Sequence, residues 1–167
     1  MAAEPARAQT KEYQVKAAFL LNFTQFVQWP AAAFSGPDAP LCIGILGDDP
    51  FGPALEETVR GESIQDHKLA VRHGQKIEDL TDCQMVFVSK SENGRVPEIL
   101  AKIDSHPVVT VSEVAGFAKR GGTINFYRDQ NKVRFEINPA SARQSGLKIS
   151  SQLLGLGKII ESPGDNK

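Results

Sequence analysis

The side chains best suited to chemistry in this sequence are a pair of adjacent aspartates, three histidines and a late group of basic residues. The segment Gly47–Gly52, which reads Gly-Asp-Asp-Pro-Phe-Gly, directly follows a short apolar run. The carboxyl end of such a strand is where open α/β sheets bind ligands. Its two carboxylates would repel a phosphate, and Pro50 has no N–H to donate. We therefore interpret Asp49 as a helix cap, with a ligand contact as the alternative.

The histidines form no recognisable catalytic or metal-binding pattern. His67, His73 and His106 match no zinc-ligand spacing, so we interpret them as surface or turn residues. The sequence contains no Gly-x-Ser-x-Gly, no His-Glu-x-x-His and no phosphate-binding loop. We therefore assign no catalytic residue, no metal site and no cofactor, and we expect a protein that is not an enzyme.

Three basic residues near the end of the chain form a candidate ligand site. Arg134 is expected on the outward face of the last long strand and Arg143 on the short helix that follows. Lys148 precedes the cap of the final helix, whose exposed amides could help to hold an anion. The alternative is ordinary surface charge.

A helix predicted over 11–28, capped by Thr10, is the first element that could position a binding surface. Its apolar residues extend beyond a single stripe, and Trp29 before Pro30 ends it. Such a helix is either sunk between the sheet and loops or partly in contact with another chain. For the second case the candidate partner-binding residues are Phe19, Phe23, Phe26 and Trp29.

The remaining pattern alternates strands and helices. Strands are predicted over 41–47, 68–72, 84–89 and 108–111, and helices from Pro50, over 96–103 and over 112–117 with Ser112 as a cap. Such alternation favours parallel strands with right-handed crossovers. After Gly121 the pattern changes to a half-buried antiparallel hairpin over 124–137, turned through 128–131.

The end of the chain predicts two further helices. Asn138 and Pro139 begin one that Gly146 closes. The last starts near Ser150, with Ile149, Leu153, Leu156 and Ile160 on one stripe. The sequence therefore predicts a single Rossmann-like α/β domain over 11–160, with disordered tails over 1–10 and 161–167. Its open mixed sheet has a parallel core, a C-terminal antiparallel hairpin and helices on both faces.

The two cysteines fall at corresponding positions in this scheme. Cys42 lies at the start of the first strand and Cys83 just before the third. In one common strand order these strands are parallel neighbours, which would bring the two Cα atoms within disulfide reach. A bridge would indicate an oxidising compartment, and two independent buried thiols are the alternative.

Composition excludes several classes of protein. The chain has 167 residues and a net charge of -1, which argues against a nucleic-acid binder or a polybasic membrane-surface protein. No apolar run reaches the length of a membrane span, so we expect no direct insertion. Residues 1–10 contain no signal-peptide h-region, yet their Ala-Ala-Glu-Pro start is typical of a mature end after signal cleavage. A native start with a disordered tail is the alternative.

Taken in order, the motifs resemble the YfiR family of periplasmic regulatory proteins. The resemblance covers roughly 12–160, and no single motif is specific without the others. The segments that carry it are Lys16–Phe23, Trp29–Pro30, Cys42–Gly52, Cys83–Ser89, Val109–Ser112, Gly121–Phe126, Val133–Asn138 and Gly146–Leu154.

The resemblance implies a Rossmann-like fold without catalytic residues, located in the periplasm and often dimeric. Its best-known member represses a membrane diguanylate cyclase by binding that enzyme's periplasmic domain. We therefore expect a regulator of cyclic di-GMP signalling whose partner is the periplasmic domain of a membrane-bound signalling protein, with a homodimer as a further expectation. A periplasmic small-molecule sensor is the alternative, and Lys148 and Ser150 fall where the family has a basic, polar loop. That member's second cysteine pair is replaced here by Gly121 and Gly122, so redox regulation through that pair does not transfer.

Overall fold

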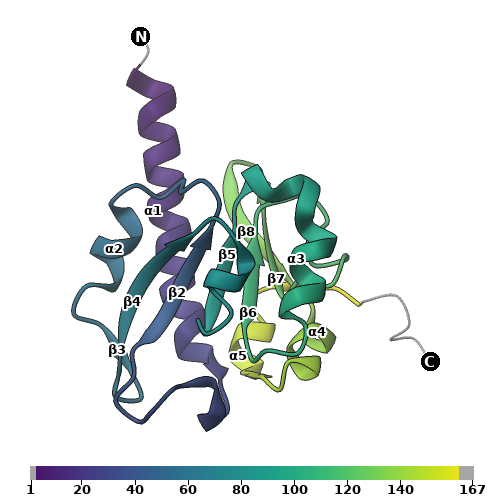
Figure 1. The fold of residues 1–167 in the computed structure, drawn as a ribbon. Coiled ribbons are helices and arrows are strands. Elements are labelled where there is room, and N and C mark those ends of the chain that lie inside the picture. Colours follow the sequence, from purple (N-terminus) through teal and green to yellow (C-terminus); the bar gives the residue numbers. More distant parts are fainter. Residues whose placement is uncertain (1–2, 162–167) are drawn as a thin grey trace.

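A computed structural model describes residues 3–161 of the chain (Figure 1). Its α-helices are α1 (Ala3–Phe26), α2 (Ala54–Val59), α3 (Val96–Ile103), α4 (Pro139–Gln144) and α5 (Ser151–Leu154). Its strands are β1 (Val27–Gln28), β2 (Leu41–Leu46), β3 (Ser63–Ile64), β4 (His67–Gly74), β5 (Met85–Val88), β6 (Val109–Ser112), β7 (Ile124–Asp129), β8 (Lys132–Ile137), β9 (Lys148–Ile149) and β10 (Lys158–Ile159). Short 3-10 helices lie at Ala31–Ala33, Ile77–Asp79 and Lys90–Arg95.

The main sheet is open and mixed, as predicted. Its eight strands run in the order β10-β8-β7-β6-β5-β2-β4-β3. The pairs from β4 through β2, β5 and β6 to β7 are parallel, while β7 and β8 form an antiparallel hairpin. A separate small sheet joins β1 to β9 in antiparallel pairing, which ties the end of α1 to the C-terminal part of the chain.

Two hydrophobic clusters cover the two faces of this sheet. Successive residues of a strand point to opposite faces, so β2 contributes Ile43 and Ile45 to one cluster and Leu46 to the other. The first cluster is completed by α1, α2 and α5, and the second by α3 and the turns around Leu80 and Phe117. The predicted α/β class with helices on both faces is confirmed.

The helix α1 begins at Ala3 rather than at Lys11, so residues 3–10, predicted as a tail, have helical backbone. Alanine, glutamate, arginine and glutamine favour helix there, and Pro5 falls in the first turn, where proline is tolerated. The C-terminal tail predicted over 161–167 lies, apart from Glu161, outside the described residues.

The helix predicted at Asp49 and Pro50 starts later, at Ala54. The cause is Gly52, whose φ of 56° belongs to the left-handed region that a right-handed helix excludes. The Asp49 carboxylate instead accepts the Phe51 N–H at 2.7 Å, which makes a local turn. The interpretation of Asp49 as a helix cap is therefore wrong.

The helix predicted over 112–117 is absent from the described structure for a related reason. Ser112 is the last residue of β6, and its hydroxyl accepts the Val114 N–H at 3.0 Å while donating to the Val88 carbonyl at 2.7 Å. The chain then turns at Gly116, whose φ is 75°. Ser112 thus closes a turn between two parallel strands rather than capping a helix.

The C-terminal segment is partly as predicted. Asn138 caps α4 by accepting the Ser141 N–H, and Gly146 follows the helix with a φ of 77°, so both predictions are confirmed. Ser150 caps α5, but this helix ends at Leu154 and is followed by β10. The predicted stripe is therefore wrong beyond Leu153: Leu156 lies outside the helix with 70% of its surface exposed.

The disulfide Cys42–Cys83 is present, with Cα atoms 4.6 Å apart. The predicted adjacency is confirmed, because β2 and β5 are parallel neighbours and Cys83 lies just before β5. The bridge lies in the cluster on the α3 side of the sheet.

Candidate partner-binding groove

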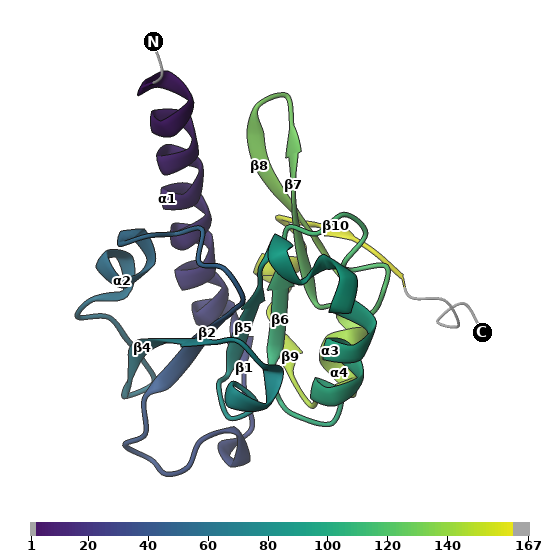
Figure 2. The ribbon, with the colours of Figure 1, turned by 45° about the horizontal axis from the view of Figure 1, so that its top comes forward.

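Two elements project from one end of the molecule and leave a groove between them. They are the first half of α1 and the hairpin β7–β8, both seen at the top of Figure 2. The groove has a volume of about 520 Å³, and its apolar floor is formed by Val15, Phe19 and Val133. Val15 keeps 38% of its surface exposed, and in the floor it is joined by Phe19 and Val133, so the apolar surface is shared by both walls of the groove.

Helical and strand periodicities account for this floor. Val15 and Phe19 are one helical turn apart and so share a face of α1. On the hairpin, Phe126 and Phe135 pair across the strands and contact Phe19 within the core. Two residues further toward the tip, on the same face of the sheet, the cross-strand pair becomes Arg128 and Val133. The groove is therefore an outward continuation of the core.

The rim of the groove is basic. Lys11, Arg128 and Lys132 surround the apolar floor. Glu12 also lines it, but its carboxylate is engaged by Lys16 and, at 3.3 Å, by Arg128. The Glu12–Arg128 ion pair joins the helix to the hairpin, so the two walls of the groove are connected electrostatically.

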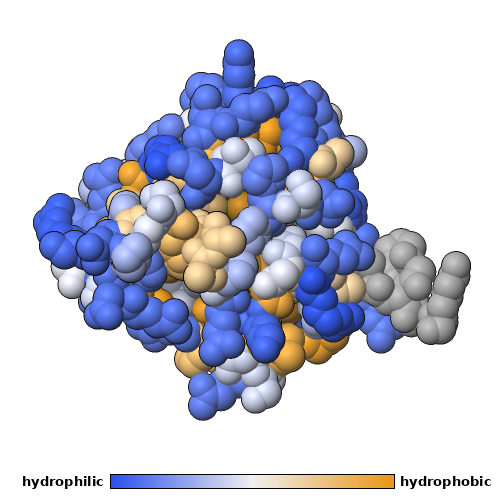
Figure 3. Space-filling model, turned by 60° about the horizontal axis from the view of Figure 1, so that its bottom comes forward, coloured by the Kyte–Doolittle hydropathy of each residue, from blue (hydrophilic) through white to orange (hydrophobic). Residues whose placement is uncertain are grey.

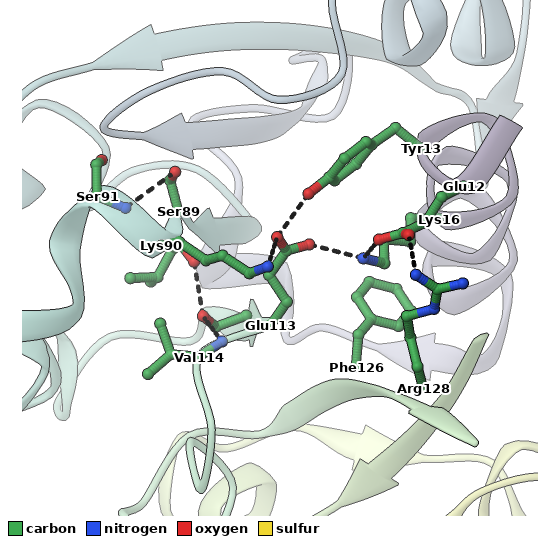
Figure 4. A network of polar contacts seen from close by, with 12 residues as sticks. Glu12, Tyr13, Lys16, Ser89, Lys90, Ser91, Glu113, Val114, Phe126 and Arg128 are labelled. Carbon is green, nitrogen blue, oxygen red and sulfur yellow. Dashed lines mark hydrogen bonds and ion pairs between the residues drawn. The ribbon is translucent and has the colours of Figure 1, made fainter. Parts of the chain in front are cut away.

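A buried ionic network anchors the helix below the groove (Figure 4). The Glu113 carboxylate, just after β6, accepts a hydrogen bond from the Tyr13 hydroxyl at 2.6 Å and one from the Lys16 ammonium at 2.8 Å. The side chains of Lys16 and Glu113 are 4% and 5% exposed. Lys90, 68% exposed, reaches the same carboxylate at 3.4 Å. Removing either partner of such a buried pair would leave an uncompensated buried charge, which destabilises the folded state.

The network shifts two pKa values. Burial alone would raise the pKa of Glu113, but the hydrogen bonds from Lys16 and Tyr13 outweigh burial and hold this pKa below its usual value. Burial, reinforced by the adjacent Glu113 carboxylate, raises the pKa of Tyr13 well above its usual value of 10.0. Glu113 is therefore an anion at neutral pH and Tyr13 a neutral donor to it.

The ligand position expected at the carboxyl ends of β2 and β5 is occupied by the protein's own side chains. The Ser91 hydroxyl accepts the Asp48 N–H at 3.0 Å, and the nearby Glu92 is 6% exposed. A Cβ on Gly47 would lie 2.8 Å from a Glu92 carboxylate oxygen. The second carboxylate oxygen of Asp49 contacts His73 at 2.8 Å. These polar groups are thus engaged with one another.

The four predicted partner-binding residues do not form a common surface. Phe23 is fully buried, with its ring centroid 5.0 Å from that of Phe135, so it has no surface to offer. Phe19, Phe26 and Trp29 are partly buried against the same cluster. The Trp29 indole donates to the Gln84 carbonyl at 2.9 Å. Of the four, Phe19 is the one that lines the groove.

The predicted ligand-binding residues are separated into two places. Arg134 lies on the hairpin, where it forms an ion pair with Asp129 at 3.3 Å. Arg143 and Lys148 line a cavity of about 320 Å³ beside α4 and α5. Lys148 and Ser150 also line a second cavity of about 540 Å³, together with several glutamines. The Ser150 hydroxyl itself accepts the Gln152 N–H, as the cap of α5.

Sequence reasoning missed Val15, Arg128 and Val133, which together with Phe19 define the groove. The alternation of the hairpin was visible, but nothing in the sequence places its tip beside α1. It also missed the pair of Lys16 and Glu113. A lysine on the apolar part of a predicted helix was the one available signal, since a buried lysine requires an acidic partner.

Other classes of site find no support in the described part of the chain. Within it, no group of three or more histidine, cysteine, aspartate or glutamate side chains could hold a metal ion. None of the described helices combines the length and apolar character needed to cross a bilayer. The opposite end of the molecule, which comes forward in Figure 3, is mostly hydrophilic with small apolar patches between polar groups.

Comparison with known proteins agrees with the resemblance. A conserved domain protein from Vibrio cholerae O1 biovar El Tor, known as a crystal structure, has 10% identity and a TM-score of 0.52, over 73% of this chain and 54% of that chain. This likeness concerns the fold alone, and the match spans about half the length of the other protein. No curated protein matches. A family model described as YfiR/HmsC-like, a family of periplasmic, regulatory rather than catalytic proteins, matches residues 13–158. Because that match covers most of the sequence, the chain belongs to the YfiR/HmsC-like family.

Proposed function

We propose that this chain is a non-enzymatic periplasmic regulator that binds and represses a membrane-bound diguanylate cyclase, and so lowers cyclic di-GMP. The observation that supports the proposal is the open groove between α1 and the β7–β8 hairpin, with its apolar floor and basic rim. A groove of this kind can take an extended or helical segment of a partner, whose side chains enter between its two walls. Membership of a family of signalling regulators supplies the class of partner.

The polar groups described above favour a binding protein over an enzyme. Ser91, Glu92 and Asp49 lie where an α/β enzyme would bind its substrate, and they are engaged with neighbouring protein groups. Glu113 is held as an anion by two donors, which suits an anchor for α1 rather than a proton donor in catalysis.

The cysteines and the family support the proposed compartment. A disulfide between Cys42 and Cys83 persists in an oxidising environment such as the periplasm. Both described cysteines are in this bridge. A protein acting there could reach only the periplasmic part of a membrane enzyme.

The proposal is tested by measuring intracellular cyclic di-GMP by mass spectrometry in the bacterium that encodes the chain. Deleting its gene is expected to raise cyclic di-GMP, and expression fused to an export signal is expected to restore the original level. The same chain retained in the cytoplasm is the matched control and is expected to have no effect. An unchanged level after deletion, or restoration by the cytoplasmic form, would contradict the proposal.

A small-molecule sensor is the second candidate, favoured by the cavity of about 540 Å³ next to Lys148 and Ser150. A ligand bound there would raise the unfolding midpoint in a thermal-shift screen of amino acids, sugars and anions. The shift should disappear in Lys148→Ala. A shift that survives this substitution would place the ligand elsewhere.

A further inference from the structure

We propose that the groove between α1 and the β7–β8 hairpin binds an acidic peptide segment of the partner, whose aliphatic side chains contact Val15 and Val133 and whose carboxylates meet the basic rim. This inference rests on the proposed function, because it specifies the chemistry of the partner that a regulator of this kind would bind. A segment of this composition complements both the floor and the rim of the groove.

The charge of the rim favours an acidic occupant. Among the residues that the structure describes, Lys11 and Lys132 form no ion pair, and both are exposed. Glu12 already has two cationic partners, so it does not neutralise these lysines. A partner carboxylate would therefore meet unpaired positive charge, which accelerates association and disfavours basic partners.

Arg128 is a second point of recognition. Its side chain is 58% exposed, and one guanidinium nitrogen contacts Glu12 at 3.3 Å. Arginine can bind a carboxylate through two parallel hydrogen bonds. A carboxylate of the partner can bind the free side of Arg128 without breaking the contact to Glu12.

The shape of the groove favours a peptide over a lipid surface. The groove is lined by residues of both α1 and the hairpin. These two elements project from the same end of the molecule (Figure 2), so a flat bilayer would meet them before it met the floor. Val15 and Phe19 lie one helical turn apart on the floor, and a single peptide segment can place its side chains against both. The overall charge of -1 also gives little attraction to an anionic membrane.

Two substitutions with matched controls test the groove. Val15→Asp places a carboxylate on the apolar floor, and Gln14→Asp makes the same change at the neighbouring exposed position of α1 outside the groove. Lys132→Glu reverses a rim charge, and Lys119→Glu reverses an exposed charge that does not line the groove. Circular dichroism and thermal unfolding would first establish that all four variants fold.

The probe is a fluorescent peptide of glutamate and leucine, with a lysine and leucine peptide for comparison, titrated by fluorescence anisotropy. The acidic peptide is expected to bind saturably to the wild-type chain. Val15→Asp and Lys132→Glu are each expected to weaken this binding by about tenfold or more. The first buries a carboxylate at the contact, and the second opposes the carboxylates of the peptide. The two control variants are expected to bind the acidic peptide as the wild type does, and the basic peptide is expected to show no saturable binding. Absence of saturable binding, or equal weakening by the controls, would overturn the inference. So would binding to phosphatidylglycerol vesicles in place of the peptide, or a dimer that Val15→Asp dissociates.

Measuring the same variants in the cyclic di-GMP assay separates the two proposals. If the exported wild-type chain represses and Val15→Asp represses equally well, the groove assignment is wrong while the regulator proposal stands. If the wild-type chain does not repress, the regulator proposal fails, and the peptide titration still decides whether the groove binds acidic segments.

Discussion

Replacing Glu113 by glutamine is expected to destabilise the protein by roughly 3 kcal/mol, the lower part of the range for breaking a buried ion pair. Glu113→Gln keeps the shape of the side chain but removes the charge that faces Lys16 at 2.8 Å. The lower part of the range applies because Lys16 retains its contact with Glu12, which is 17% exposed. For a domain whose total stability is about 5 to 15 kcal/mol, this is a large loss.

Urea unfolding followed by circular dichroism measures this loss as a lower midpoint with an unchanged slope. Glu98→Gln is the matched control, because its ion pair with Lys102 lies on the surface, where Glu98 is 61% exposed. It should leave the midpoint nearly unchanged. If Glu113→Gln costs no more than Glu98→Gln, the network does not anchor α1.

A double substitution sharpens the test. Lys16→Met combined with Glu113→Gln removes both charges of the buried Lys16–Glu113 pair, so the double variant should be more stable than Glu113→Gln alone, which keeps the buried ammonium with Glu12 as its one remaining anionic partner. Simple addition of the two single costs would refute the direct coupling.

The pH dependence of the free energy of unfolding tests the same network. The folded-state pKa of Glu113 is lowered, so its contribution to stability is present above about pH 4.5 and lost as pH falls through the lowered value. Glu113→Gln should show a flatter stability profile there.

Three further outcomes follow from other contacts. Because the folded-state pKa of Tyr13 is raised above 10.0, unfolding free energy should fall as pH rises beyond 10 in the wild type and fall less in Tyr13→Phe; parallel profiles would contradict the assignment. The disulfide closes a loop of sequence separation 41, so replacing Cys42 and Cys83 by serine should cost about 2 to 4 kcal/mol in urea unfolding, and a smaller loss would mean a structured unfolded state. Gly47→Ala should cost more than about 1 kcal/mol, because Gly47 has a φ of 88° and its Cβ would meet Glu92. An unchanged thermal midpoint in that variant would mean that the turn relaxes freely.

The parts of the fold that were predictable have strong local signals. The buried strands β2 and β5 are continuous apolar runs, and α3 spans Val96–Ile103 as predicted because its apolar spacing is regular. The hairpin turn is carried by Gln130 and Asn131, both with positive φ, inside the predicted range. The bridge between Cys42 and Cys83 followed from a correct strand order.

The errors arose where backbone conformation or distant packing decided the outcome. Gly52 and Gly116 have left-handed conformations that exclude the helices predicted around them, and composition did not reveal this. The helix after Ser150 ends after one turn, with Gly155 as its C-terminal cap, and the chain then continues into β10, which pairs with the distant strand β8.

The site was harder to predict than the fold because its parts come from distant segments. The pair Lys16–Glu113 is separated by 97 positions, and a lysine alone does not name its partner. Phe23 and Val15 both looked like members of one apolar helix surface. The rings of Phe126 and Phe135 cover Phe23, which is therefore buried in the core. Val15 stays exposed, because the tip of the hairpin lies across the groove from it.

The most direct test of the central claim is intracellular cyclic di-GMP in cells that lack the gene and export, at equal levels, the wild-type chain, Val15→Asp or Gln14→Asp. We expect Gln14→Asp to lower cyclic di-GMP as the wild type does and Val15→Asp to leave it high, because only the first keeps the groove intact. Failure of the exported wild-type chain to lower cyclic di-GMP would contradict the account of this protein as a repressor.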